Sequence, residues 1–151
     1  MGHLSRFVTY AIKFEQAYAS GEWALVGPCF TEGAVYAVLG PPPFAAQHKG
    51  RDAVLASFDS ATRAFDKQFA SREVLVLDGP EERQGHVFMH WAAIYHLPGA
   101  PDLRIEGKTK AFFSGDQIQR LEDEIPTEYG AHTLSYLAAH GEKLRVSAKR
   151  S

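Results

Sequence analysis

The chain has a single cysteine, Cys29, so no internal disulfide can form, and this fits a reducing compartment. It also lacks any apolar run near the roughly 18 residues that a membrane-spanning helix needs. The apolar stretch at 7–12 is too short for a secretory signal, and charged residues follow it. We therefore expect a soluble, cytoplasmic protein without membrane contact.

A strong charge of either sign is missing as well. The formal net charge is −2, and charged residues are dispersed along the chain except for a basic tail near its end. Because nucleic acids and anionic membranes attract basic surfaces, neither is an expected partner. Glycine-rich phosphate-binding motifs, the His-Glu-x-x-His zinc motif and the Gly-x-Ser-x-Gly nucleophile motif are also absent. We expect no cofactor and no metal ion.

What is present is the pattern of one folded domain. The chain has 151 residues, of which 45% are hydrophobic and 23% charged, as in ordinary globular domains. Apolar residues at helical spacing predict helices, and alternating or continuous apolar runs predict strands. The predicted helices are 4–19, 22–26, 52–69 and 127–140, and the predicted strands are 34–39, 70–78, 84–97, 103–114 and 117–125. Helices followed by a series of strands with short connections indicate an α+β fold, in which a curved, mainly antiparallel sheet wraps around the helices.

A family pattern is visible in three stretches of the sequence. They are YASGEWALVGPCFTEGAVY at 18–36, HKGRDAVL at 48–55 and FFSGDQIQRLEDEI at 112–125. They are similar, in this order, to three passages of the nuclear transport factor 2-like superfamily: the entry into the first strand, the start of the third helix, and a hairpin ending in an acidic residue. Over about residues 5–126 the chain thus resembles the SnoaL-like members of that superfamily, the polyketide cyclase and ketosteroid isomerase-like proteins.

This resemblance implies N-terminal helices packed in the concave face of a cone-shaped barrel, followed by a C-terminal helix. The whole chain, 1–151, would be a single SnoaL-like domain with its core at about 5–126, the C-terminal helix at 127–141 and a basic tail at 142–151. The resemblance also implies dimers. Because the superfamily holds isomerases, cyclases, dehydratases, epoxide hydrolases and proteins without catalytic activity, the fold alone does not select a reaction.

The central strand, 84–97, is largely apolar on both faces. A strand covered on both sides lies in the middle of a sheet, with the core on one face and a second layer or a partner subunit on the other. The sequence leaves open which face is concave. If the face of His90 and Phe88 is concave, both side chains line the pocket. Trp91 and Tyr95, on the other face, would then form the convex surface of a homodimer.

Asp123 is the most suggestive polar residue of the sequence. On the last predicted strand it shares a face with Leu121 and Ile125, both apolar. Burial would raise the pKa of Asp123 and suit it to general acid/base chemistry. The structural alternative is an exposed carboxylate, or one paired with Arg104 or Arg120. By the same placement, Leu121 is a candidate substrate-binding residue.

His90 is the second catalytic candidate, because a histidine accepts or donates a proton near neutral pH and a carboxylate partner would fix its tautomer. The alternative is a hydrogen-bonded core histidine. His86 is four residues away, about 13 Å along a strand, which is too far for the two to share a metal ion.

In the predicted strand 103–114, charged residues alternate with apolar ones. The charged set should be convex, and the other set, which includes Phe113, should face the pocket, making Phe113 a candidate substrate-binding residue. The charged set is Arg104, Glu106, Lys108 and Lys110.

Three aromatic residues complete the candidate site. The Tyr36 hydroxyl, on the first predicted strand, is placed to hydrogen-bond a ligand at the end of the pocket, with a core tyrosine as the alternative. Tyr18 and Trp23 are candidate substrate-binding residues whose alternative role is packing at the junction of the first two helices.

We interpret these features as those of a cofactor-free enzyme that transfers protons on a small apolar substrate, as an isomerase, cyclase, dehydratase or hydrolase. Asp123 would be the acid/base, His90 its partner and Tyr36 the group that orients the ligand. By resemblance to limonene-type epoxide hydrolases, Tyr36 falls at their water-holding tyrosine and Asp123 at one of their two aspartates, whereas Ala92 stands at the other. By resemblance to ketosteroid isomerases, Val38 occupies the position of their general-base aspartate. The ketosteroid isomerase reaction is therefore not expected. The alternatives are a non-catalytic ligand-binding protein and a dimeric protein-interaction module.

Overall fold

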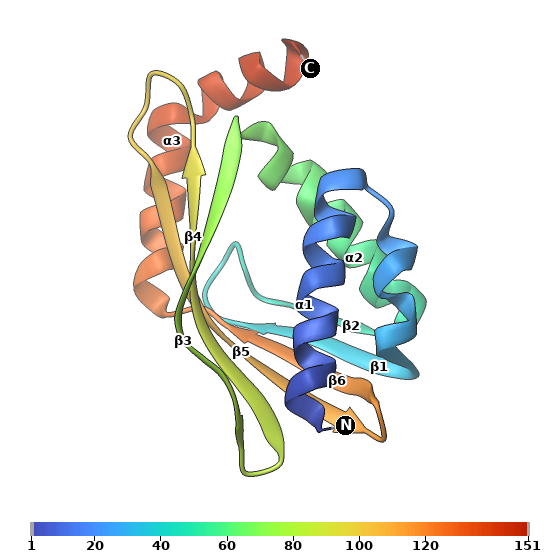
Figure 1. Ribbon diagram of the computed structural model, residues 1–151. Helices are drawn as coiled ribbons and strands as arrows, with labels where there is room; N and C mark the ends of the chain where they lie inside the picture. Colours follow the sequence, from blue (N-terminus) through green and yellow to red (C-terminus); the bar gives the residue numbers. More distant parts are fainter. Residues whose placement is uncertain (1, 151) are drawn as a thin grey trace.

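This computed structural model describes residues 2–150 of the protein, and side chains within residues 2–144. Three α-helices, two short 3-10 helices and six strands follow one another along the described chain (Figure 1). Their bounds are α1 (His3–Ser20), η1 (Trp23–Cys29), β1 (Phe30–Leu39), β2 (Ala46–Lys49), α2 (Arg51–Ala64), η2 (Asp66–Gln68), β3 (Ser71–Arg83), β4 (His86–His96), β5 (Leu103–Ser114), β6 (Gln117–Glu124) and α3 (Thr127–Arg150).

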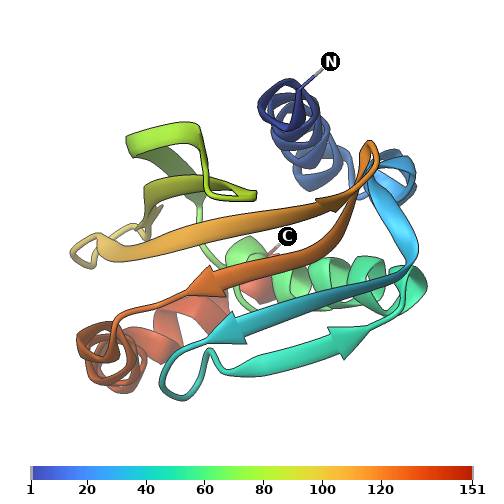
Figure 2. The ribbon, with the colours of Figure 1, turned by 90° about the horizontal axis from the view of Figure 1, so that it is seen from below.

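The strands form one mixed sheet in the order β2-β1-β6-β5-β4-β3 (Figure 2). Neighbouring strands are antiparallel except β1 and β6, which are parallel. The sheet bends strongly, so that β3 and β4 rise beside α1 and α2 while β1 and β6 pass beneath these helices (Figure 1). Its edges, β2 and β3, do not pair with each other, so the sheet stays open. The predicted α+β fold with a curved, mainly antiparallel sheet around N-terminal helices is confirmed.

The strand register decides which side chains face the helices. Residues that lie opposite one another on neighbouring strands share a face. One such row crosses four strands and consists of Val38, Asp123, Thr109 and Met89. Tyr36, two residues before Val38, lies on the same face, and its ring packs 5.1 Å from that of Phe58 in α2. This row therefore belongs to the concave face.

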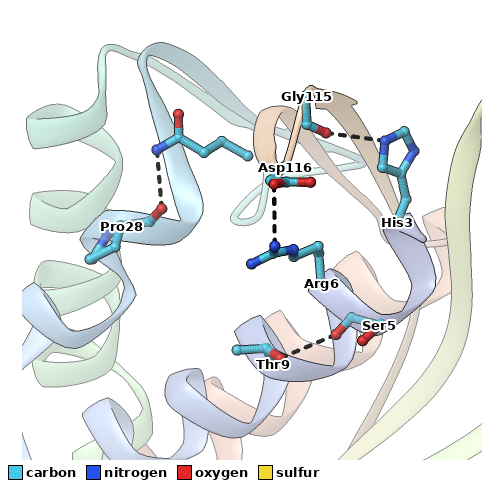
Figure 3. A network of polar contacts seen from close by, with 8 residues as sticks. His3, Ser5, Arg6, Thr9, Pro28, Gly115 and Asp116 are labelled. Atoms are coloured by element: carbon cyan, nitrogen blue, oxygen red, sulfur yellow. Dashed lines mark hydrogen bonds and ion pairs between the residues drawn. The ribbon is translucent and has the colours of Figure 1, made fainter. Parts of the chain in front are cut away.

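The N-terminal end of α1 is fastened to the turn between β5 and β6 (Figure 3). His3 donates a hydrogen bond of 3.1 Å from Nε2 to the carbonyl of Gly115, and Arg6 donates one of 3.2 Å to Asp116. At its other end α1 stops at Gly21, whose φ of 80° and N–H bond to the carbonyl of Ala17 form a left-handed cap. The helix thus lies across the concave face at a fixed place.

The buried apolar residues form two core clusters, one under α1 and α2 and one beside α3. Tyr36 and Met89 pack at the margin of the first cluster, and Val38 and Trp91 at the margin of the second. Tyr36 and Val38 are two residues apart on one strand face, as are Met89 and Trp91. The two clusters therefore meet at this level of the sheet, which is the level of Asp123.

Helix α3 continues to Arg150, beyond Gly141, where the sequence predicted its end. Leu144, which is buried in the second core cluster, holds the helix against the protein past this glycine. Tyr136 also donates a 2.6 Å hydrogen bond to the carbonyl of Pro101, in the turn between β4 and β5. None of the described helices combines the length and the apolar character that a membrane crossing requires.

Other boundaries differ from the predicted ones as well, and three of the differences have a clear cause. Strand β2 lies inside the predicted connection after β1, because it is short and depends on pairing with β1 rather than on a local pattern. Strand β3 runs through Gly79 and Pro80, with register shifts around them that accommodate the turn-forming residues. Helix α2 ends at Ala64, and the separate turn η2 begins at Asp66.

Candidate functional site

Four side chains form a chain of hydrogen bonds across the concave face. Tyr36 on β1 donates from its hydroxyl to Oδ2 of Asp123 on β6 at 2.7 Å, and Thr109 on β5 donates to Oδ1 at 2.5 Å. Trp91 on β4 donates from Nε1 to the hydroxyl oxygen of Thr109 at 2.8 Å. Each oxygen of the carboxylate thus accepts a hydrogen bond from an uncharged donor.

Two close contacts position this network. The ring of Phe58 in α2 packs edge-on against Tyr36. On the other side, Gly107 leaves room for Trp91: a Cβ at position 107 would overlap the six-membered ring of the indole and come within 2.9 Å of Ile125. The indole therefore lies directly over the backbone of β5, which sets the direction of its N–H group.

Asp123 has no cationic partner among the described residues. The two arginines that the sequence offered as partners are bound elsewhere: Arg120 lies 2.5 Å from Glu122, and Arg104 lies 3.4 Å from Glu106. The alternative of a salt-bridged Asp123 is therefore wrong. A buried carboxylate that only neutral donors stabilise is a group whose protonation state responds to a bound ligand.

The surroundings of Asp123 favour its protonated form. Burial raises its pKa, and the hydrogen bonds from Thr109 and Tyr36 offset this rise only in part. Burial and the nearby charge of Asp123 also raise the pKa of Tyr36 and of Tyr10 well above the usual tyrosine value. Both phenols therefore stay protonated at neutral pH. By solvent accessibility, Asp123 and Tyr36 are each half-buried.

His90 lies on the opposite face of the sheet from Asp123. Its neighbour Met89 belongs to the concave row, so the side chain of His90 points to the convex side. There its Nε2 atom lies 3.2 Å from Glu106. The prediction that His90 shares a cavity with Asp123 is wrong, because β4 turns its other face to the helices. The described residues also include no group of three side chains that could hold a metal ion.

Three aromatic residues of β4 also lie on the face opposite to the predicted one. Phe88 is convex, with the guanidinium of Arg83 3.7 Å above its ring, and does not line the concave face. Trp91 and Tyr95, expected on a convex partner surface, point inward instead, and Tyr95 donates a hydrogen bond of 3.3 Å to Asp66. The prediction of a homodimer surface at Trp91 and Tyr95 is wrong.

The other predicted residues lie on the concave side at different levels. Leu121 is buried in the first core cluster, directly beside the hydrogen-bonded network. Trp23 packs 5.6 Å from Phe58 in the helical part of this core, and Phe113 stacks on the ring of His3 at 4.7 Å. Neither takes part in the network around the carboxylate. Tyr18 lies in a second polar cluster, under the guanidinium of Arg72 and near Asp66.

Sequence reasoning places Thr109 on the pocket face without identifying it as a partner of Asp123, and it misses Trp91 and Asp66 as polar members of the concave face. The position of Thr109 opposite Asp123 depends on the register between β5 and β6, which an alternating pattern does not fix. Trp91 was assigned to the wrong side with the rest of its strand face. Asp66 lay inside a predicted helix, and only the break after Phe65 turns it inward.

An open apolar groove runs along the outside of the site, between α1 and β3. Its lining includes Val8, Ile12, Val76, Pro80 and Met89. Because Met89 also belongs to the concave row, the groove reaches the neighbourhood of the polar network.

No protein-family model and no curated protein matches the sequence. Solved structures match over most of the chain. A nuclear transport factor 2-like protein from Burkholderia xenovorans superposes with a TM-score of 0.61 at 16% identity, over 85% of this chain and 95% of its own. A nuclear transport factor 2-like protein from Anabaena variabilis gives 0.63 at 16% identity, over 81% and 87%. A protein with a ketosteroid isomerase-like fold from Catenulispora acidiphila, in complex with trimethylamine, gives 0.56 at 16% identity, over 76% and 82%.

Proposed function

We propose that this chain, whose fold is that of the nuclear transport factor 2-like proteins, binds a small and largely apolar molecule against Asp123 and acts on it by proton transfer without a cofactor. The reaction class is isomerisation, cyclisation, dehydration or hydrolysis. The observation that carries the proposal is the buried carboxylate of Asp123, held by Tyr36 and Thr109 and without a cationic partner among the described residues.

The proposed roles follow from the protonation states of these groups. A carboxyl group with a raised pKa donates a proton in its acid form and removes one in its carboxylate form, at a pH closer to neutrality than an exposed aspartate allows. The Tyr36 phenol, which stays protonated, orients the carboxylate and donates to a ligand oxygen when the ligand displaces one of the existing hydrogen bonds. Thr109 and Trp91 keep the second carboxylate oxygen at a fixed place.

The neighbours of Asp123 support an apolar substrate. Its own strand face carries Leu121 and Ile125, and the opposing positions on β1 and β4 are Val38 and Met89. A ligand against this surface would meet methyl groups and aromatic rings except at the carboxyl group. Desolvation of the reacting atoms strengthens their interaction with a single polar group.

A second candidate function is the binding of a small organic cation without catalysis. A buried carboxylate near the rings of Tyr36 and Trp91, with no lysine or arginine paired to it in the described part of the chain, is a suitable site for an amine. The Catenulispora protein that superposes on this chain holds trimethylamine.

The deciding experiment compares two single substitutions on the same strand. Asp123→Asn removes the proposed acid/base, whereas Glu124→Gln changes an exposed carboxylate on the other face. The wild-type protein is screened with small ketones, epoxides and alcohols, and its turnover is measured with both variants. We expect Asp123→Asn to lower kcat by about 100- to 10,000-fold, as for loss of a general acid or base, and Glu124→Gln to leave it unchanged.

Equal activity of the two variants would remove Asp123 from the reaction. If none of the compounds is turned over, while trimethylamine binds to the wild type and not to Asp123→Asn, the cation-binding function replaces the enzymatic one. Binding to both proteins is measured by isothermal titration calorimetry, and in the wild type the chemical shift of the Asp123 carboxyl carbon also reports on the group in question.

We also propose a homodimer, formed through α1 and β3 rather than through the convex face. Six of the nine large apolar side chains that are exposed in the described chain lie on these two elements. They are Val8, Ile12, Val74, Leu75, Val76 and Leu77. Strand β3 is an unpaired edge, and its middle, residues 74–77, carries four apolar side chains and no charge, which favours contact with a second copy there.

A further inference from the structure

Asp66 is a second carboxylate on the concave side. It begins η2, directly after Phe65, and its Oδ2 atom accepts the hydrogen bond from Tyr95 at 3.3 Å. Tyr18 also directs its hydroxyl to this carboxylate. The rings of Phe65 and Phe69 pack against Tyr95 at 5.2 Å and 4.9 Å, so the group is enclosed by aromatic residues. Burial raises the pKa of Asp66 despite these hydrogen bonds.

Arg72 on β3 faces this cluster and is almost entirely buried. Its side chain is 10% exposed, its guanidinium lies 3.7 Å over the ring of Tyr18, and one terminal nitrogen donates to Glu15 at 2.6 Å. The Nε atom is buried as well, but no hydrogen-bond partner for it exists among the described residues. Because a guanidinium N–H is seldom left unpaired inside a protein, this donor needs an explanation.

The charges of Arg72 and Asp66 interact, and the guanidinium opposes the rise of the aspartate pKa. However, the two side chains do not come within the 4.0 Å that would make an ion pair. A donor and an acceptor are thus held near each other without bonding directly. A group that joins them must accept a hydrogen bond from Nε and donate one to the carboxylate, and a hydroxyl group does both.

We propose that Arg72 and Asp66 form a second polar subsite, which binds a hydroxyl group of the ligand, with Tyr18 and Tyr95 as its aromatic walls. The subsite rests on the proposed function, since it assigns the substrate to the class of apolar molecules that carry a hydroxyl group away from the reacting atoms. Both polar regions lie on the concave side, because Tyr95, which donates to Asp66, shares the inner face of β4 with Trp91, which donates to Thr109 of the network around Asp123.

The proposal is tested with benzyl alcohol and toluene, two probes of similar size that differ in the hydroxyl group. The Nε–Hε signal of Arg72 is observed by ¹⁵N NMR in the full-length protein and assigned through its loss in Arg72→Lys. We expect benzyl alcohol to shift this signal in a saturable manner and toluene to leave it in place. In Asp66→Ala, benzyl alcohol should bind about tenfold more weakly, the effect of losing one hydrogen bond to a charged group.

The matched control is Asp59→Ala, which removes an aspartate of α2 that pairs with Arg63 at the surface. It should leave the binding of benzyl alcohol unchanged. A signal that both probes shift equally, or that neither shifts, overturns the proposal and leaves Arg72 as a structural tie between β3 and α1. Equal affinity of the wild type and Asp66→Ala for benzyl alcohol also overturns the proposal.

The subsite and the proposed reaction can fail separately. In Asp123→Asn, which lacks the proposed acid/base, benzyl alcohol should still shift the Arg72 signal. If benzyl alcohol shifts this signal but no compound is turned over, the subsite is supported and the proposed reaction is excluded. If turnover depends on Asp123 but the Arg72 signal does not respond to benzyl alcohol, the proposed reaction is supported and the subsite is excluded.

Discussion

The hydroxyl of Tyr36 and the carboxylate of Asp123 are joined by a 2.7 Å hydrogen bond between two parallel strands. The bond stabilises the ionised form of the carboxylate, since a phenol donates more strongly to a negative oxygen than to a neutral one. Thr109 acts on the other oxygen in the same way. Burial works in the opposite direction and prevails, so the pKa of Asp123 is set by a balance that single substitutions can shift.

Tyr36→Phe should raise the pKa of Asp123 further, because the hydrogen bond that favours the carboxylate is lost. The titration is followed through the carboxyl carbon of Asp123 by ¹³C NMR. Tyr129→Phe is the matched control, since this tyrosine donates to Glu106 and not to Asp123. An unchanged or lowered pKa in Tyr36→Phe would show that the bond is not formed in solution.

The stability of the protein should depend on pH through Asp123. Its pKa is higher in the folded protein than in the unfolded chain, so its contribution to the free energy of unfolding is full below the unfolded value of about 3.9 and is lost as pH rises through the folded value. Asp123→Asn does not titrate. Relative to this variant, the wild type should therefore be more stable near about pH 4 than near about pH 7 in urea unfolding. A difference that is independent of pH would contradict the raised pKa.

Gly107→Ala should displace Trp91, because the added Cβ would overlap the indole ring. We expect a loss of about 1–3 kcal/mol in the free energy of unfolding, as for overpacking of a core, and a change in the fluorescence of the indole. The hydrogen bond from Trp91 to Thr109 should be lost as well. Gly33→Ala is a suitable control, since a Cβ at that position meets no atom within 4 Å. Equal stability of the two variants would place the indole elsewhere.

On the convex side, Glu106 connects α3 to the sheet. It accepts a 2.7 Å hydrogen bond from Tyr129, and its pKa is lowered by that bond and by those from Arg104 and His90. Its contribution to stability is therefore present above its unfolded pKa and lost as pH falls through the lower folded value. Tyr129→Phe should cost about 1 kcal/mol at neutral pH and less in acid, measured by urea unfolding. A cost that does not fall in acid would exclude this role.

Val76→Lys and Ile12→Lys should produce a monomer if α1 and β3 form the proposed homodimer. Both side chains are more than half exposed in the single chain, so the substitutions disturb little else. Leu134→Lys, at a similarly exposed position of α3, is the control and should not change the mass. The mass is measured by light scattering after gel filtration. A wild-type protein that is monomeric over the whole concentration range would exclude the dimer.

Much of the fold could be predicted from the sequence, because its signals are local. The bounds of β5 agree with the prediction, since charged and apolar residues alternate along that strand and only one of its faces can be buried. The position of Asp123 between Leu121 and Ile125 followed from the same rule. Asp123 is half-buried on the concave face and burial raises its pKa, whereas its catalytic role stays a prediction.

The errors have a common physical cause. Both faces of β4 are apolar, so no alternation marks the inner one, and His90 and Trp91 were exchanged between the two sides. The deciding fact is the register with β5, in which His90 lies opposite the charged Lys108. That register depends on the turn between the strands. Asp66 was missed for a related reason, because the end of α2 is set by packing of Phe65 and Phe69 against Tyr95 rather than by a breaking residue.

Tyr36 and Asp123 are 87 residues apart in the chain, and the parallel pairing of β1 with β6 brings them together. Prior formation of the hairpins β3-β4-β5 would bring β6 back to β1 and shorten the loop that this pairing closes. Pairing between distant segments closes a large loop and is a slow step of folding. The site should therefore be assembled last, so a chain still emerging from the ribosome has no site, and the return of the Asp123 environment after dilution from denaturant will report the completion of folding.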